Sequence, residues 1–167
     1  VPFAHEKIDE WRNNFQGIRY IDKERGYNFG GAIDDVWQKP NGELIISDVK
    51  ATSVNQFDWD DRAEKPYGKG YKRQLEMYQW LFRKNGFDVA DEAYLVYFNG
   101  LKNEPMFDQV LKFELHLVKI ECNDSWVENT VIEAAGLLKS NEYPEASPSC
   151  ENCNYLRARW RVSPKTN

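Results

Sequence analysis

A carboxylate and an ammonium group, Asp48 and Lys50, stand two positions apart in the run GELIISDVKAT at residues 42–52. Side chains alternate between the two faces of an extended strand, so both groups would share a face with Leu44 and Ile46. Such a pair at the end of an apolar strand can serve a divalent cation and a hydrolytic reaction. Spacing alone leaves a plain surface ion pair as the alternative.

A hairpin is predicted between this strand and the run YNFGGAIDDVW at residues 27–37. A two-residue turn at Asn41 and Gly42 would place Pro40 in the ladder, where its missing N–H and fixed φ are unfavourable. A three-residue loop uses Pro40 and Asn41 as turn residues and Gly42 in the left-handed conformation. The residue types therefore favour the three-residue loop.

The turn decides which aspartate faces Asp48. The three-residue loop pairs Lys39 with Glu43 and, counted back at constant register, Asp34 with Asp48. A two-residue turn would bring Asp35 to that place, and a bulge would shift the count. We therefore expect Asp34 to be the partner of Asp48.

Two carboxylates on facing strands repel each other and raise each other's pKa unless a cation lies between them. Mg²⁺ and Mn²⁺ prefer oxygen ligands, and two carboxylates completed by waters are a typical set. Lys50, beside Asp34 and Asp48, is placed to orient or deprotonate a water activated by the metal, or to stabilise charge at the phosphorus centre. These are the groups that phosphodiester hydrolysis needs.

Asp34 is followed after thirteen residues by Asp48-Val49-Lys50, a spacing that resembles the signature of the PD-(D/E)XK nuclease superfamily. The segment Gly31-Ala32-Ile33-Asp34 resembles the corresponding strand of its RecB-like branch. Gln74 and Tyr78 resemble the Gln-x-x-x-Tyr motif that a helix of this branch carries. Because positions i and i+4 share a helix face, both side chains can address the site.

The resemblance implies roles for individual residues. The catalytic set would be Asp34, Asp48, Lys50, Gln74 and Tyr78, and the ligands of Mg²⁺ or Mn²⁺ would be Asp34, Asp48 and the carbonyl of Val49. Lys50 would serve the attacking water, and Gln74 would position Lys50 or the DNA. Members of the branch often add a ligand from the first helix, which makes His5 or Glu6 a candidate. A helix cap or a surface position is the alternative for His5.

Apolar spacing predicts the elements that hold these residues. We expect helices over residues 4–15, 71–86 and 124–139, strands over 27–37, 42–52, 93–98 and 109–120, a loop over 53–70, and a short helix after Cys153. Helices packed against one small mixed β-sheet make an α/β fold. The resemblance implies a restriction-endonuclease-like core, in which helices flank the sheet and a β-hairpin carries the metal site.

The net charge of −5 argues against a protein that coats nucleic acid nonspecifically, but basic residues gather over residues 62–84. The expected phosphate contacts, close to Gln74, are Lys65, Lys69, Lys72 and Arg73. Solvated surface charge is the alternative. Phe57 and Trp59 precede this zone and could either stack on bases or anchor their loop to the domain.

Three cysteines, Cys122, Cys150 and Cys153, do not make a disulfide framework, and we expect a reducing, cytoplasmic location. The element Cys150-x-x-Cys153-x-Tyr resembles one that holds an iron–sulfur cluster in some RecB-like nucleases, including CRISPR-associated ones. Three thiols cannot complete a four-thiolate site, so we expect no such cluster unless upstream residues or a second chain contribute. We interpret residues 141–167 as a basic tail that contains two of these cysteines.

The length of 167 residues fits a single nuclease domain over residues 1–167. The chain begins without an initiator Met, which indicates missing upstream residues, and no apolar run of about 18 residues could span a membrane. We expect a Mg²⁺- or Mn²⁺-dependent deoxyribonuclease, either an exonuclease or an endonuclease, that acts on single- or double-stranded DNA in repair, recombination or defence. The alternative is a non-catalytic or weakly catalytic DNA-binding module of a larger repair or CRISPR-type complex.

Overall fold

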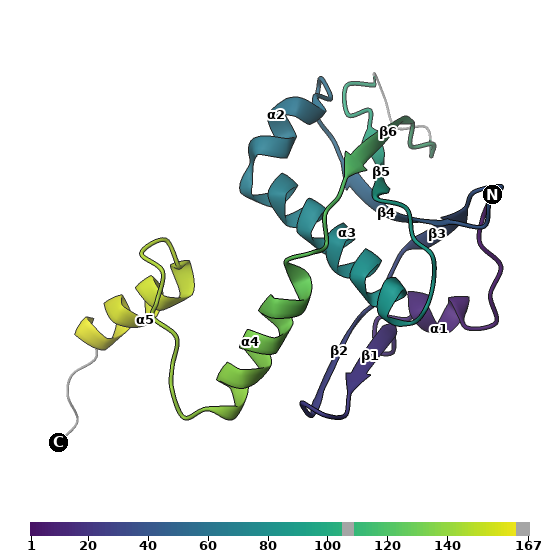
Figure 1. Ribbon diagram of the computed structural model, residues 1–167. Helices are drawn as coiled ribbons and strands as arrows, with labels where there is room; N and C mark the ends of the chain where they lie inside the picture. The colour runs from purple at the N-terminus through teal and green to yellow at the C-terminus, as the bar shows by residue number, and fades with distance from the viewer. Residues whose placement is uncertain (105–108, 163–167) are drawn as a thin grey trace. The chain divides into compact units, whose positions relative to one another are not determined.

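The computed structural model describes residues 1–104 and 109–162, and the chain divides into two compact units, Val1–Ile132 and Glu133–Asn167. The first unit contains every strand of the described residues and the candidate site. Figure 1 shows the long helix α3 (Pro66–Lys84) beside the strands of this unit. No helix in the described part of the chain is long and apolar enough to cross a membrane.

A four-stranded mixed sheet forms the centre of the first unit. Its strands are, in spatial order, β3 (Asp35–Gln38), β4 (Leu44–Thr52), β5 (Glu92–Gly100) and β6 (Phe113–Glu121). Strands β4 and β5 run parallel, and the two outer pairs are antiparallel. The connection from β4 to β5 contains α3, as a parallel pair requires a long crossover. The predicted small mixed sheet flanked by helices is confirmed.

Helix α1 is shorter than predicted and covers only Ile8–Arg12, so the prediction of a helix over residues 4–15 is wrong at both ends. Asn13 adopts an extended conformation, and its side chain accepts a hydrogen bond from the N–H of Phe15 at 2.8 Å. This local bond competes with a further helical turn. Trp11 is buried, whereas Phe15 is 92% exposed and takes no part in the core.

A separate two-stranded sheet, β1 (Ile18–Asp22) and β2 (Tyr27–Gly31), precedes the central sheet. The prediction of one strand over residues 27–37 is wrong, because the chain breaks between β2 and β3. In that break the buried Ile33 donates its N–H to the carbonyl of Trp11 at 3.1 Å. This bond ties the start of β3 to α1.

Two helices occupy the segment for which the sequence predicts a loop over residues 53–70. They are α2 (Trp59–Glu64) and the first turns of α3, so the loop prediction is wrong beyond Asp58. Asp58 caps α2, since its side chain accepts a hydrogen bond from the N–H of Asp61 at 3.3 Å. Pro66 occupies the first position of α3, where a helix needs no N–H donor.

The core of the first unit lies between α3 and the face of the sheet that α3 covers. Its buried members include Leu75, Trp80, Leu81 and Phe82 from α3, Leu44 and Ile46 from β4, and Leu95 and Tyr97 from β5. Each such side chain stabilises the fold by about 1.5–3 kcal/mol relative to an exposed position. The packing therefore fixes α3 against β4, together with the polar residues that these two elements share.

The second unit contains the end of α4 (Val127–Lys139) and helix α5 (Glu151–Val162). The predicted helix over residues 124–139 is confirmed except for its first turn. The helix predicted after Cys153 begins before that residue. The Sγ of Cys150 accepts a hydrogen bond from the N–H of Cys153 at 3.4 Å, and this backbone donor lowers the pKa of the Cys150 thiol.

Two glycines of α3 should respond in opposite ways to replacement by alanine. A Cβ on Gly68 would lie 2.1 Å from the carbonyl oxygen of Arg62, whereas a Cβ on Gly70 would meet nothing within 4 Å. We expect Gly68→Ala to lower the free energy of unfolding by about 1–3 kcal/mol through overpacking. Gly70→Ala should raise it by up to about 1 kcal/mol, because alanine favours the helix.

Urea unfolding of the two variants beside the original chain measures both changes. Each variant adds the same methyl group to the same helix, so Gly70→Ala is the matched control. A Gly68→Ala variant as stable as Gly70→Ala would contradict the close packing of α2 on α3.

Candidate metal centre

The hairpin of β3 and β4 has the predicted three-residue turn. The N–H of Lys39 donates to the carbonyl of Glu43 at 2.9 Å, and the N–H of Gly42 donates to the carbonyl of Lys39 at 3.0 Å. Gly42 has a φ of 94°, in the left-handed region that favours glycine. The turn chemistry therefore sets the register of the whole hairpin.

This register places Asp34, and not Asp35, against Asp48. Strand β3 begins with Asp35 opposite Ser47, so one further step sets Asp34 opposite Asp48, as the sequence predicts. The Oδ2 of Asp34 accepts a hydrogen bond from the N–H of Val49 at 2.7 Å. That bond holds the Asp34 side chain over β4.

Asp35 serves a different purpose from its neighbour. Its carboxylate pairs with Arg12 of α1 and accepts a hydrogen bond from Nε1 of Trp37 at 3.2 Å. Arg12 also donates through Nε to the backbone carbonyl of Asp34 at 3.1 Å. Asp35 thus ties β3 to α1 and leaves Asp34 as the carboxylate that faces β4.

Asp48 is 2% exposed, so the alternative of a surface ion pair with Lys50 is wrong. Burial is the main cause that raises the pKa of Asp48, and the ion pair with Lys50 acts in the opposite direction. The nearby Asp34 carboxyl raises this pKa further. Two carboxyl groups therefore converge beside a single ammonium, which is the conflict that a bound cation relieves.

Lys50 is held from three sides. Its Nζ pairs with Asp48, donates to Oε1 of Gln74 at 3.3 Å and lies 4.7 Å from the ring centroid of Tyr71. Nε2 of Gln74 in turn donates to the hydroxyl of Tyr78 at 2.9 Å. The structure thus brings Gln74 and Tyr78 to the site on one face of α3, as their spacing predicts.

Gly31 allows this arrangement because it has no side chain. A Cβ at that position would lie 2.8 Å from Cε1 of Tyr78, closer than a carbon atom can approach. The ring of Tyr78 therefore packs directly on the end of β2. Burial raises the pKa of Tyr78, so its hydroxyl stays neutral as the acceptor of the Gln74 bond.

A family model described as the PD-(D/E)XK nuclease superfamily matches residues 2–158. The chain belongs to the PD-(D/E)XK nuclease superfamily. This membership fits the two converging carboxylates, since PD-(D/E)XK nucleases generally use divalent metals.

Among solved structures, this PD-(D/E)XK chain is similar to the crystal structure of a protein called SSO0001, with 16% sequence identity and a TM-score of 0.42. The match covers 87% of this chain and 56% of that one, so the chain spans little more than half the length of that protein. No curated protein sequence gives a significant match.

His5 lies in an aromatic cluster of this PD-(D/E)XK protein. Its ring stacks on Trp11 with the centroids 4.5 Å apart, and its Nδ1 accepts a hydrogen bond from the N–H of Lys7 at 3.1 Å. Within residues 1–104 and 109–162, no group of three or more His, Cys, Asp and Glu side chains could hold a metal ion. The metal roles expected for Asp34, Asp48 and His5 therefore stay predictions, and of the three only Asp34 and Asp48 converge beside Lys50.

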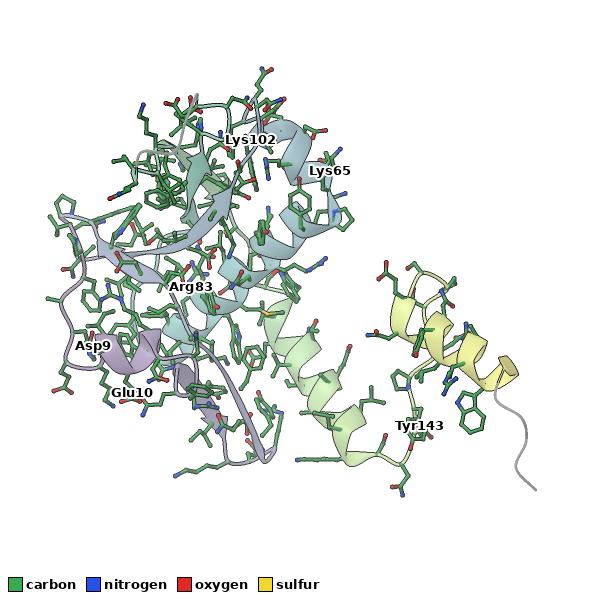
Figure 2. All side chains as sticks on the ribbon, turned by 180° about the vertical axis from the view of Figure 1, so that it is seen from behind. Asp9, Glu10, Lys65, Arg83, Lys102 and Tyr143 are labelled. Carbon is green, nitrogen blue, oxygen red and sulfur yellow. The ribbon has the colours of Figure 1, made fainter. Side chains whose placement is uncertain are left out.

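The four expected phosphate contacts lie on or beside the first half of α3, and three of them have acidic partners. Lys65 pairs with Asp61 at 2.8 Å, Lys69 with Glu64 at 3.2 Å and Lys72 with Glu76 at 3.8 Å, while Arg73 is exposed and has no ion pair among the described residues. Figure 2 shows Lys65 and Lys102 toward one end of the first unit, away from Asp9 and Glu10. Contact of Lys65, Lys69, Lys72 and Arg73 with DNA stays a prediction.

Phe57 anchors its loop to the domain. Its ring stacks on His116 with the centroids 4.2 Å apart and lies 4.9 Å from that of Tyr97. Trp59 also packs against Tyr97, at 6.0 Å. Of the two interpretations of these aromatic residues, anchoring fits their contacts. Arg62 lies among the same rings, and no motif of the sequence assigns it a separate role.

The contact between Gly31 and Tyr78 should appear as a coupling energy. We expect Gly31→Ala to lower the free energy of unfolding by about 1–3 kcal/mol, because the added methyl group displaces the Tyr78 ring. In a Tyr78→Ala background the same change should cost much less, since the clash is gone. Urea unfolding of the four chains in this double-mutant cycle measures the difference. Equal losses in both backgrounds would show that Gly31 matters for another reason.

Proposed function

We propose that the protein is a RecB-like, Mg²⁺- or Mn²⁺-dependent deoxyribonuclease that hydrolyses phosphodiester bonds by attack of water on phosphorus. One observation carries the proposal: Asp34, directly before β3, converges with Asp48 of β4, and Lys50 lies beside them. Membership of a nuclease superfamily supports the same chemistry.

Asp34 and Asp48 would hold the metal, and the carbonyl of Val49 is a further candidate ligand. The donor set fits, because both converging groups are carboxylates, the ligands that Mg²⁺ and Mn²⁺ prefer. Asp48 is buried and Asp34 is exposed, so waters can complete the set from the open side. When bound, the metal supplies Lewis acidity that stabilises charge on the phosphoryl oxygens.

Lys50 is the residue that we assign to the attacking water or to the reacting phosphate. Its ammonium group is fixed by Gln74 and Tyr71, so it can orient a water, or stabilise phosphoryl charge, without reorganisation during the reaction. As the oxygen of water bonds to phosphorus, the bond from phosphorus to the leaving oxygen breaks. Gln74 acts as a positioning residue through Lys50, and Tyr78 acts through Gln74.

The RecB-like assignment rests on the segment Gly31-Ala32-Ile33-Asp34 and on Gln74 and Tyr78. Contact between Gly31 and the Tyr78 ring links these two motifs physically and supports reading them together. We place the activity in DNA repair, recombination or defence, with a larger repair or CRISPR-type complex as a partner.

Asp34→Asn should lower the rate of DNA cleavage in Mn²⁺ by about a hundredfold or more, the scale of losing one preorganised electrostatic group. Asp35→Asn is the matched control, since it makes the same change at the adjacent carboxylate, which pairs with Arg12. That variant should keep most of the original rate. Initial rates on labelled single-stranded and duplex DNA measure both, with unfolding curves as a check on folding. Equal losses in the two variants would contradict the assignment.

Lys50→Met should separate metal binding from hydrolysis. Removing the ammonium group frees Asp48 from its competing partner, so Mn²⁺ binding measured by calorimetry should persist or tighten. Cleavage should be lost, because no other cation of the described residues is paired with Asp48. Asp48→Asn should lose both properties. If the original chain binds DNA but neither binds Mn²⁺ nor cleaves, the protein is instead a non-catalytic binding module.

A further inference from the structure

Arg62 lies on α2 without a carboxylate partner among the described residues. Two acids of this helix, Asp61 and Glu64, pair with lysines instead. Nη2 of Arg62 donates to Oγ1 of Thr52 at 2.9 Å, and the side chain is only partly exposed. A guanidinium group has five N–H donors, so most of its capacity is left for another acceptor.

Aromatic rings surround this guanidinium group. Its Cζ lies 5.4 Å from the ring centroid of Phe57, 5.9 Å from that of Tyr67 and 5.7 Å from that of Tyr97. Burial raises the pKa of Tyr97 to about 12, so its hydroxyl group is neutral at physiological pH. The rings orient the positive charge of Arg62 without neutralising it.

Thr52 connects Arg62 to the candidate metal centre. Asp48, Lys50 and Thr52 are alternate residues of β4, so their side chains share one face of the sheet. Thr52 lies four residues beyond Asp48, about 13 Å along the strand. This separation matches a phosphate farther along an extended nucleic-acid strand than the immediate neighbour of the scissile one. Figure 1 shows α2 beside the N-terminal end of α3, at the end of β4 to which Thr52 belongs.

We propose that Arg62 binds a backbone phosphate of the DNA strand beyond the scissile phosphate and so fixes that strand at the Thr52 end of β4. This inference rests on the proposed nuclease function and extends it to a second phosphate subsite. A partly buried guanidinium group is suited to the task, because it binds two phosphate oxygens at once and is weakly hydrated. Thr52 and the three rings act as positioning residues for it.

A purely structural role is the competing account, in which Arg62 only fastens α2 to β4. The test removes charge from each partner separately. DNA-binding constants are measured by fluorescence anisotropy without divalent metal, on single-stranded oligonucleotides that carry one uncharged methylphosphonate linkage at successive positions. The original chain should bind the oligonucleotide about tenfold less tightly when the methylphosphonate replaces the phosphate that Arg62 contacts. A tenfold change is the scale of one charge-assisted hydrogen-bond contact.

Arg62→Met keeps an apolar stem in the aromatic cluster and removes the charge. It should bind fully charged DNA about tenfold less tightly and should no longer respond to the neutral linkage at that position. Its slope of log K against log salt should fall by about 0.7, the value for one single-strand phosphate contact. Arg62→Lys should lie between the two, because it keeps the charge and loses the two-point contact.

Arg19→Met is the matched control, since Arg19 is an exposed arginine of β1 outside the site. It should keep the response of the original chain to the neutral linkage. The inference is overturned if Arg62→Met keeps that response too, or if its salt slope is unchanged. Should Arg62→Met not fold, the methylphosphonate scan of the original chain and of Arg62→Lys still decides, because an unchanged response in Arg62→Lys would also overturn it.

DNA binding without metal tests the phosphate subsite, and DNA cleavage with Mn²⁺ tests the nuclease proposal, so either proposal can fail without the other. If the chain does not cleave DNA but Arg62 still couples to one linkage, the nuclease proposal fails and the phosphate subsite stands. If the chain cleaves DNA and Arg62→Met binds and cleaves like the original, the subsite fails and the nuclease proposal stands.

Discussion

The approach of Asp34 to Asp48 is the contact on which the rest of the site depends. Two carboxyl groups side by side repel each other when both are ionised, and burial of Asp48 makes its charge still less favourable. The fold imposes the contact nevertheless, through the hairpin register and the bond from the N–H of Val49 to Asp34. Two adjacent carboxylates lower the stability of the folded protein, but they are suited to binding a divalent cation. Burial is the largest cause of the raised pKa of Asp48, and the ion pair with Lys50 does not offset it fully.

A second set of contacts fixes Lys50, and it depends on close packing as much as on hydrogen bonds. Gln74 accepts from Lys50 and donates to Tyr78, and the Tyr78 ring rests on Gly31. Any side chain at Gly31 would push that ring away and loosen the chain of contacts that ends at the ammonium group. Gly31 and the Gln74–Tyr78 motif of α3 therefore act together to position Lys50.

Much of this site could be predicted from the sequence because its causes are local. Pro40 and Gly42 determine the turn, the turn determines the register, and the register selects Asp34. The four-residue spacing of Gln74 and Tyr78 likewise determines that they share a helix face. Each of these inferences uses only residues near one another in the chain.

The features that could not be predicted depend on contacts between residues far apart in the sequence. The break before β3 depends on a bond between Ile33 and Trp11, and helix α2 has six residues, too few to be stable without tertiary packing. None of these partners is adjacent in the sequence, so hydrophobic periodicity could not reveal them.

The proposed binding of DNA does not conflict with the acidic net charge of the protein. Lys65 and Lys69 sit in exposed ion pairs on α2 and α3, which are individually weak and screened by salt, so a phosphate can replace the carboxylate at little cost. Arg62 needs no such exchange, since it has no carboxylate to give up among the described residues. Net charge therefore says little about binding here. What matters is that Arg62 donates to Thr52, which shares a face of β4 with Asp48 and Lys50, so that one phosphate would be held while another of the same strand meets the metal.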